Sequence, residues 1–75
     1  MQAPHAYNVF RRKRQPALRC AVPQDQPVPI FLHGEKWEFG GTIKGNQPTP
    51  AGFRPDAASD AVRLTGFYLF HALRA

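Results

Sequence analysis

The sequence is short of the features that usually stabilise or localise a small protein. Cys20 is its single cysteine, so no disulfide can form within the chain. The histidines, His5, His33 and His71, are widely spaced, and no cysteine pair or His-x₃-His spacing joins them, which argues against a zinc site. The longest apolar stretch, residues 64–73, is far below the ~20 residues of a membrane span, and no N-terminal apolar run indicates a signal peptide. We therefore expect no metal, no cofactor and no membrane segment.

The chain is also short, at 75 residues, which limits it to a single domain spanning residues 1–75. A domain of this size buries only about 60% of the surface that its unfolded chain exposes, so its core usually needs a supplement. Because a disulfide and a metal are both disfavoured, self-association as a homodimer is the supplement we expect. Six phenylalanines, two tyrosines and one tryptophan still make a folded domain credible. The lone cysteine suits a reducing compartment, so the cytoplasm is the predicted location.

Acidic residues are absent from the first 24 positions. The same positions hold five of the ten basic residues, namely Arg11, Arg12, Lys13, Arg14 and Arg19. Residues 25–75 hold the other five basic residues and all five acidic ones, so the formal net charge of +5 belongs to the N-terminal third. This asymmetry is the main indication of an anionic partner.

Two strands are predicted on either side of the basic residues, over 7–10 and 17–22. In the second, Leu18, Cys20 and Val22 share one face and Arg19 lies on the other, which is a period of two. Between the strands the alternation fails, and Pro16 lacks the donor that a central strand needs. Either one long edge strand overhangs the sheet, or residues 11–16 form the exposed loop of a hairpin. Both alternatives place the cations in water.

Residues 30–39, IFLHGEKWEF, predict a β-hairpin. Gly34-Glu35 suits a two-residue type II′ turn, and the register is well specified because a slip of one residue would mix apolar and polar faces. Pairing across the turn groups four apolar side chains on one face: Ile30, Leu32, Trp37 and Phe39. Gly40-Gly41 then permits a bulge or a sharp bend before the strand continues.

Residues 44–55 are predicted to be a long loop, since they contain three prolines and two glycines. A helix is expected over residues 56–74, with Asp56 or Ser59 as its cap and Pro55 suited to its first turn. Spacing of 100° per residue gives this helix an apolar arc that includes Leu64 and Tyr68.

Two phenylalanines disturb the amphipathic pattern of this helix. Phe67 and Phe70 fall on the polar arc beside Arg63 and Arg74, and an exposed aromatic pair of this kind usually marks an interface. The exposed pair has three possible explanations: self-association through this aromatic helix face, burial under the long loops, or contact with another protein.

The predicted fold class is therefore α+β, with a small antiparallel sheet of three or four strands packed against one C-terminal helix. Residues 1–6 are expected to be a frayed lead-in. The order of elements is too general to indicate a family, and a fold would not determine function in any case.

The leading functional prediction is a small non-enzymatic binding module for a polyanion, with nucleic acid as the first candidate. Arginine suits phosphate because its planar fork donates two hydrogen bonds and stays charged, and Tyr7 and Phe10 flank the basic segment, residues 11–19, where they could stack on unpaired bases. Alternatively, the charges protect an exposed strand edge from pairing with other chains, or RRKR is a targeting or protease signal. The rival function is a protein-interaction subunit that uses the aromatic helix face.

No residue pattern indicates catalysis. His33 has no nucleophile or carboxylate assigned to it, and Glu35 and Glu38 are not placed to share a proton. Cys20 alternates with apolar residues, so burial is the expected role of its thiol. The glycine-rich GGTIKGN does not have the spacing of a phosphate-binding loop. We expect neither an enzyme nor a small-molecule substrate.

Overall fold

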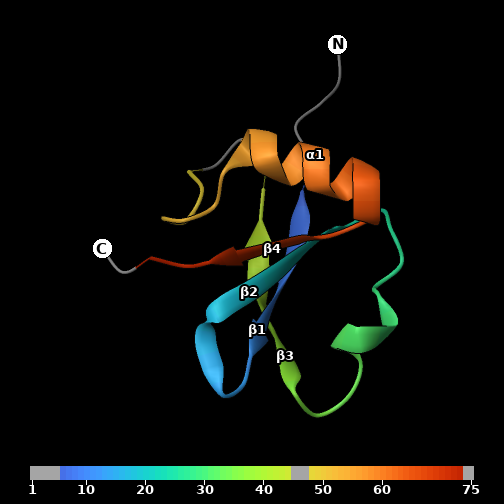
Figure 1. Cartoon of the computed structure of the whole chain (residues 1–75), viewed down its shortest axis with the longest axis vertical. Coiled ribbons are helices and arrows are strands. Elements are labelled where there is room, and N and C mark those ends of the chain that lie inside the picture. The colour runs from blue at the N-terminus through green and yellow to red at the C-terminus, as the bar shows by residue number, and fades with distance from the viewer. Residues whose placement is uncertain (1–5, 45–47, 74–75) are drawn as a thin grey trace.

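A computed structural model describes residues 6–44 and 48–73, and within them it has the predicted α+β class. The elements in chain order are β1 (Tyr7–Arg12), β2 (Gln15–Pro23), a 3₁₀ helix (Ile30–Leu32), β3 (Trp37–Ile43), α1 (Pro55–Thr65) and β4 (Tyr68–His71). The four strands form one antiparallel sheet in the order β3-β1-β2-β4. Figure 1 shows α1 lying across one end of this sheet, away from the β1–β2 turn. No helix among the described residues is long and apolar enough to cross a membrane.

The basic segment lies on the two central strands, so the predicted edge strand is wrong. β1 and β2 form a hairpin whose turn is Lys13 and Arg14, a loop much shorter than the predicted 11–16. The ladder pairs Arg11 with Arg19 but Arg12 with Gln15, which leaves residues 16–18 of β2 outside it. This irregularity accommodates Pro16, which cannot donate to a regular ladder.

The bulge predicted at Gly40-Gly41 is confirmed, and it decides which side chains face which way. Val9 pairs with Gly41 and Phe10 with Phe39, so Gly40 is the extra residue of β3. One extra residue inverts the alternation of a strand. As a result, Trp37 and Ile43 belong to different apolar clusters, on opposite faces of the sheet, although they are six residues apart.

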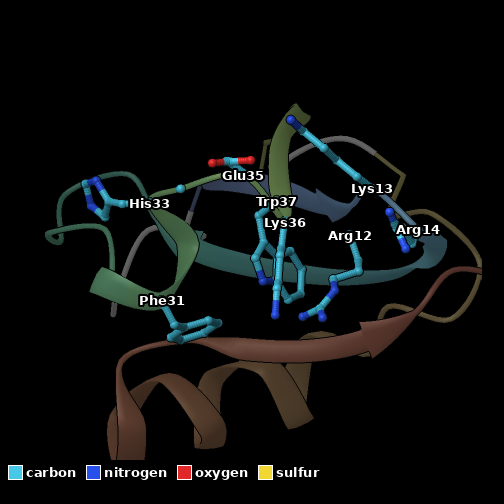
Figure 2. Close-up of a pocket in the computed structure, with 9 residues that line it drawn as sticks. Arg12, Lys13, Arg14, Phe31, His33, Glu35, Lys36 and Trp37 are labelled. Atoms are coloured by element: carbon cyan, nitrogen blue, oxygen red, sulfur yellow. The ribbon is translucent and has the colours of Figure 1, made fainter.

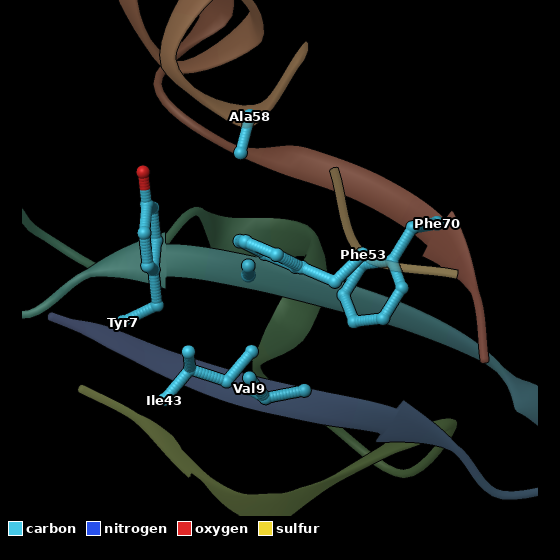
Figure 3. Close-up of a cluster of buried hydrophobic side chains, with 7 residues drawn as sticks. Tyr7, Val9, Ile43, Phe53, Ala58 and Phe70 are labelled. Atoms are coloured by element: carbon cyan, nitrogen blue, oxygen red, sulfur yellow. The ribbon is translucent and has the colours of Figure 1, made fainter. Parts of the chain in front are cut away.

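Each face of the sheet carries its own apolar cluster. On the side of α1, Phe53 lies at the centre, with its ring edge-on to those of Tyr7, Tyr68 and Phe70 at 5.2–5.5 Å between centroids. Figure 3 shows Phe53 between Tyr7 and Phe70, below Ala58 of α1. The cluster on the other face consists of Cys20, Val22, Leu32 and Trp37. The predicted separation of Cys20 and Val22 from Arg19 therefore holds.

The predicted hairpin over residues 30–39 is wrong. Residues 30–32 instead form a turn of 3₁₀ helix, in which the Leu32 N–H donates to the Pro29 carbonyl, and Ile30 is 87% exposed rather than buried. The physical reason is competition for a partner: β3 pairs with β1, which offers a six-residue ladder. A local turn pattern contains no information about such a distant strand.

The predicted helix over residues 56–74 begins in the right place and ends too late. It stops at Thr65, and Gly66 follows with φ +94°, where its N–H donates to the Val62 carbonyl at 2.8 Å. The cap expected from Asp56 or Ser59 is absent, because Arg54 occupies the cap position without a side-chain hydrogen bond. Pro55 is the first helical residue, where its missing N–H costs nothing.

The aromatic helix face consequently does not exist. Phe67 and Phe70 both follow α1, in the chain that leads into and forms β4. Phe70 is 5% exposed in the cluster on the helix side, and Phe67 packs against the cluster on the opposite side. Arg63 lies in α1 and forms an exposed ion pair with Asp60 at 3.1 Å. The predictions for Arg74, for residues 1–5 and for residues 45–47 lie outside the described residues.

Candidate nucleic-acid interface

Strand alternation divides the basic segment between the two faces of the sheet. Arg11 lies on the face of α1, where its Nε and Nη2 both lie 2.9 Å from Glu38 Oε2. Arg19, its partner in the ladder, donates from Nε to the Pro16 carbonyl at 3.1 Å. Their side chains are therefore already engaged within the protein. Arg12 follows Arg11 in β1 and therefore lies on the opposite face of the sheet, the face of Trp37.

Arg12 lies over the ring of Trp37, with its guanidinium carbon 5.5 Å from the ring centroid. This cation–π contact holds the side chain across the sheet face without neutralising its charge. Lys36 precedes Trp37, and Figure 2 shows its amine pointing the same way as the Arg12 guanidinium, beside the Trp37 ring. The two cations come from separate segments of the sequence and meet beside one aromatic ring.

A backbone hydrogen bond fixes this arrangement. The N–H of Lys13, in the β1–β2 turn, donates to the carbonyl of Lys36 at 2.9 Å. It ties the basic turn to the segment that leads into β3. The basic turn and Lys36 are therefore brought together by tertiary structure, not by sequence adjacency.

These residues line an open pocket, which we call the Trp37 groove. Its walls are Arg12, Lys13, Arg14, Phe31, His33, Gly34, Glu35, Lys36 and Trp37. The volume of the groove is about 1180 Å³, which exceeds the ~300–1,000 Å³ of pockets that enclose a small molecule.

The electrostatics of the Trp37 groove favour an anion. The lining residues include four cationic side chains and one carboxylate, that of Glu35. Within the described parts of the chain the ion pairs are Arg11–Glu38 and Arg63–Asp60, and neither involves a cation of the groove. The positive charge of this surface is therefore available to a ligand.

Two aromatic rings next to the groove are open to solvent. Phe39 on β3 is 57% exposed, with its ring edge-on to that of Phe10 at 5.9 Å, and Phe31 is 44% exposed, edge-on to Trp37 at 6.0 Å. Trp37 itself is 7% exposed, because Arg12 and Phe31 cover it. The accessible rings are thus Phe31 and Phe39.

The structure brings together only part of the predicted site. Arg12, Lys13 and Arg14 line the groove, and Phe10 lies half-buried behind Phe39. Tyr7 is buried on the opposite face of the sheet, where burial raises its pKa, so it cannot stack on a base. Arg11 and Arg19 are engaged as described above.

Four further residues belong to this surface and were not predicted to do so: Phe31, Lys36, Trp37 and Phe39. Their basic and aromatic character is visible in the sequence, but they were assigned to a hairpin. Only the pairing of β3 with β1 and the Lys13–Lys36 hydrogen bond bring them beside the basic turn.

Cys20 and His33, which were considered for catalysis from the sequence, have the following surroundings in the structure. The Cys20 thiol is fully buried, and burial raises its pKa to about 12, so it stays protonated and inaccessible. His33 Nε2 lies 3.3 Å from the Val28 carbonyl oxygen. The described residues contain no group of three histidine, cysteine or acidic side chains that could hold a metal ion.

Comparison with known proteins adds nothing to this picture, since no family model, curated protein or solved structure matches the chain.

Proposed function

We propose that this protein is a non-enzymatic module that binds nucleic acid in the Trp37 groove. The observation that carries the proposal is that Arg12 and Lys36 lie beside the Trp37 ring while Lys13 and Arg14 line the same groove, and that no ion pair among the described residues includes any of these four cations. Because no carboxylate of the described residues pairs with these cations, their charge can neutralise the phosphates of a nucleic acid. Binding then releases the counterions condensed on those phosphates, which favours the complex. The cytoplasm is the proposed location, since nucleic acid and a free thiol are both compatible with it.

The position of the basic segment weakens the alternative in which its charges only protect a strand edge. Arg11 and Arg12 pair with both β2 and β3, and Arg19 pairs with both β1 and β4, so these residues do not lie on an edge of the sheet. The rival function, protein interaction through an aromatic helix face, loses its basis because Phe70 is buried and follows the helix. Self-association stays a prediction, and binding in the groove does not require a second copy.

The experiment is a titration of a fluorescein-labelled 12-nucleotide oligothymidylate, followed by anisotropy between 50 and 200 mM salt. If the four cations each neutralise one phosphate, log K falls with log salt at a slope of about −2.8, which is roughly a 50-fold loss over this range. The double variant R12Q/K36Q is expected to reduce the slope by about 1.4.

The matched control removes the same charge at the other end of the molecule. R54Q/R63Q changes two exposed arginines at the start of α1 and within it, where the salt slope should stay as in the parent protein. Equal slopes for the two double variants would mean that only net charge matters. Absence of binding at micromolar protein in 150 mM salt would refute the proposal altogether.

A further inference from the structure

We propose that the ligand of the Trp37 groove is single-stranded, with unpaired bases stacked on Phe39 and Phe31. This inference rests on the proposed function and names the form of nucleic acid that the surface selects. Its basis is the exposure of two aromatic rings beside cations that belong to neither ion pair found among the described residues, since every base offers a flat face and every nucleotide a phosphate.

Phe39 is the clearer of the two platforms. It lies on β3, so its backbone is held in the ladder with β1, and its own ladder partner is Phe10. The Phe10 ring meets it edge-on at 5.9 Å and 79°, which leaves more than half of the Phe39 side chain in solvent. Such a ring loses little conformational freedom when a base covers it.

Phe31 provides the second platform and is itself one of the residues that line the groove. Its ring is fixed edge-on between Trp37 and Phe67, at 6.0 and 5.0 Å. Figure 2 shows it facing the ends of the Arg12 and Lys36 side chains. One nucleotide could therefore place its base on Phe31 and its phosphate against a cation.

A duplex fits this surface less well. Paired bases are already stacked on each other and cannot cover Phe31 or Phe39 without unpairing. A two-stranded ribbon can enter a major groove, but the hydrogen bond from the Lys13 N–H to the Lys36 carbonyl joins the β1–β2 turn to the segment before β3, so this end of the sheet is broader than a two-stranded ribbon. Phosphate contacts alone would remain, and these carry no preference for bases.

The test compares the 12-nucleotide strand with the corresponding 12-base-pair duplex at 150 mM salt, using the parent protein and F39L. We expect the parent to bind the single strand at least about 10-fold more tightly than the duplex. F39L should weaken single-strand binding by roughly 5- to 150-fold, the range for loss of one stacked base. The salt slope and the affinity for the duplex should be unchanged, because no charge is removed.

Three further variants separate stacking from damage to the fold. F39Y keeps an aromatic face and should retain parental affinity, and L64A removes an even more exposed apolar side chain, from α1, and should have no effect. F31L should act like F39L, with far-UV circular dichroism as a check on folding, because Phe31 also contacts Trp37 and Phe67.

The outcomes distinguish this inference from the proposed function. Stacking would be overturned if the duplex bound as tightly as the single strand, or if F39L bound the single strand as tightly as the parent. The proposed function would still stand in either case if R12Q/K36Q lowered the salt slope. Absence of salt-dependent binding to either form would overturn both.

Discussion

Two glycines with nearly the same backbone conformation are expected to respond differently to alanine. Gly52 has φ +97° and Gly66 has φ +94°, so a side chain is conformationally strained at both. A Cβ at Gly66 would have no atom within 4 Å, whereas a Cβ at Gly52 would overlap the backbone carbonyl of His71 in β4. The pair therefore separates backbone strain from steric exclusion.

The magnitudes follow from these contacts. G66A should lower the free energy of unfolding by about 1–2 kcal/mol, the cost of a left-handed conformation for an ordinary residue. G52A carries the same cost and must also push its loop away from β4. This movement stretches the hydrogen bond from the Leu73 N–H to the Ala51 carbonyl, now 2.9 Å, and disturbs the neighbouring Phe53. The expected total is about 3–6 kcal/mol.

Urea unfolding followed by Trp37 fluorescence and far-UV circular dichroism measures both values. A chain of this size has a stability of about 4–11 kcal/mol, so G66A should remain folded and G52A should be close to its limit. Equal losses for the two variants would refute the reasoning, because they would mean that the loop containing Gly52 does not lie against β4 in solution.

Two other predictions concern the two apolar clusters. F53L removes three edge-on ring contacts, with Tyr7, Tyr68 and Phe70. It should lower the free energy of unfolding by about 2 kcal/mol, measured as a drop of roughly 8–16 °C in the melting temperature. An unchanged melting temperature would contradict the central position of Phe53 in its cluster. Above pH 9 stability should fall by up to about 1.4 kcal/mol per pH unit, because the unfolded chain ionises Cys20 while the folded protein keeps its proton to about pH 12. C20A should flatten this decline, and a slope identical to that of the parent would exclude the thiol as its cause.

Local patterns in the sequence were sufficient for several features of the fold. Alternation placed Cys20 and Arg19 on opposite faces, and Gly40-Gly41 indicated the bulge that is found in β3. Proline chemistry indicated where α1 begins. In each case the deciding interactions lie within a few residues of the pattern.

The end of α1 could also have been predicted. Gly66 directly follows Thr65, a common signal for the C-terminus of a helix, and Tyr68–His71, the segment after it, is rich in aromatic residues, which are frequent in strands. The helical spacing of apolar residues across Gly66 outweighed that signal. Because Phe70 was then assigned to a helix, a core residue was interpreted as part of an interface.

Only part of the candidate site could be predicted from local sequence patterns. Charge asymmetry identified Arg12, Lys13 and Arg14, since clustering is visible along the chain. Lys36 and Phe39 join them only because β3 pairs with β1, a long-range contact that competes with the local turn at Gly34-Glu35. Alternation alone also could not show that Arg11 would find Glu38 as a partner.

The most direct test of the account is to locate the ligand on the protein by amide chemical shifts. A ¹⁵N-labelled sample titrated with the 12-nucleotide oligothymidylate should show its largest changes at Arg12 to Arg14, at Phe31 and from Lys36 to Phe39, with α1 unaffected. Changes centred on α1, or no changes at millimolar ligand in 150 mM salt, would contradict nucleic-acid binding in the Trp37 groove.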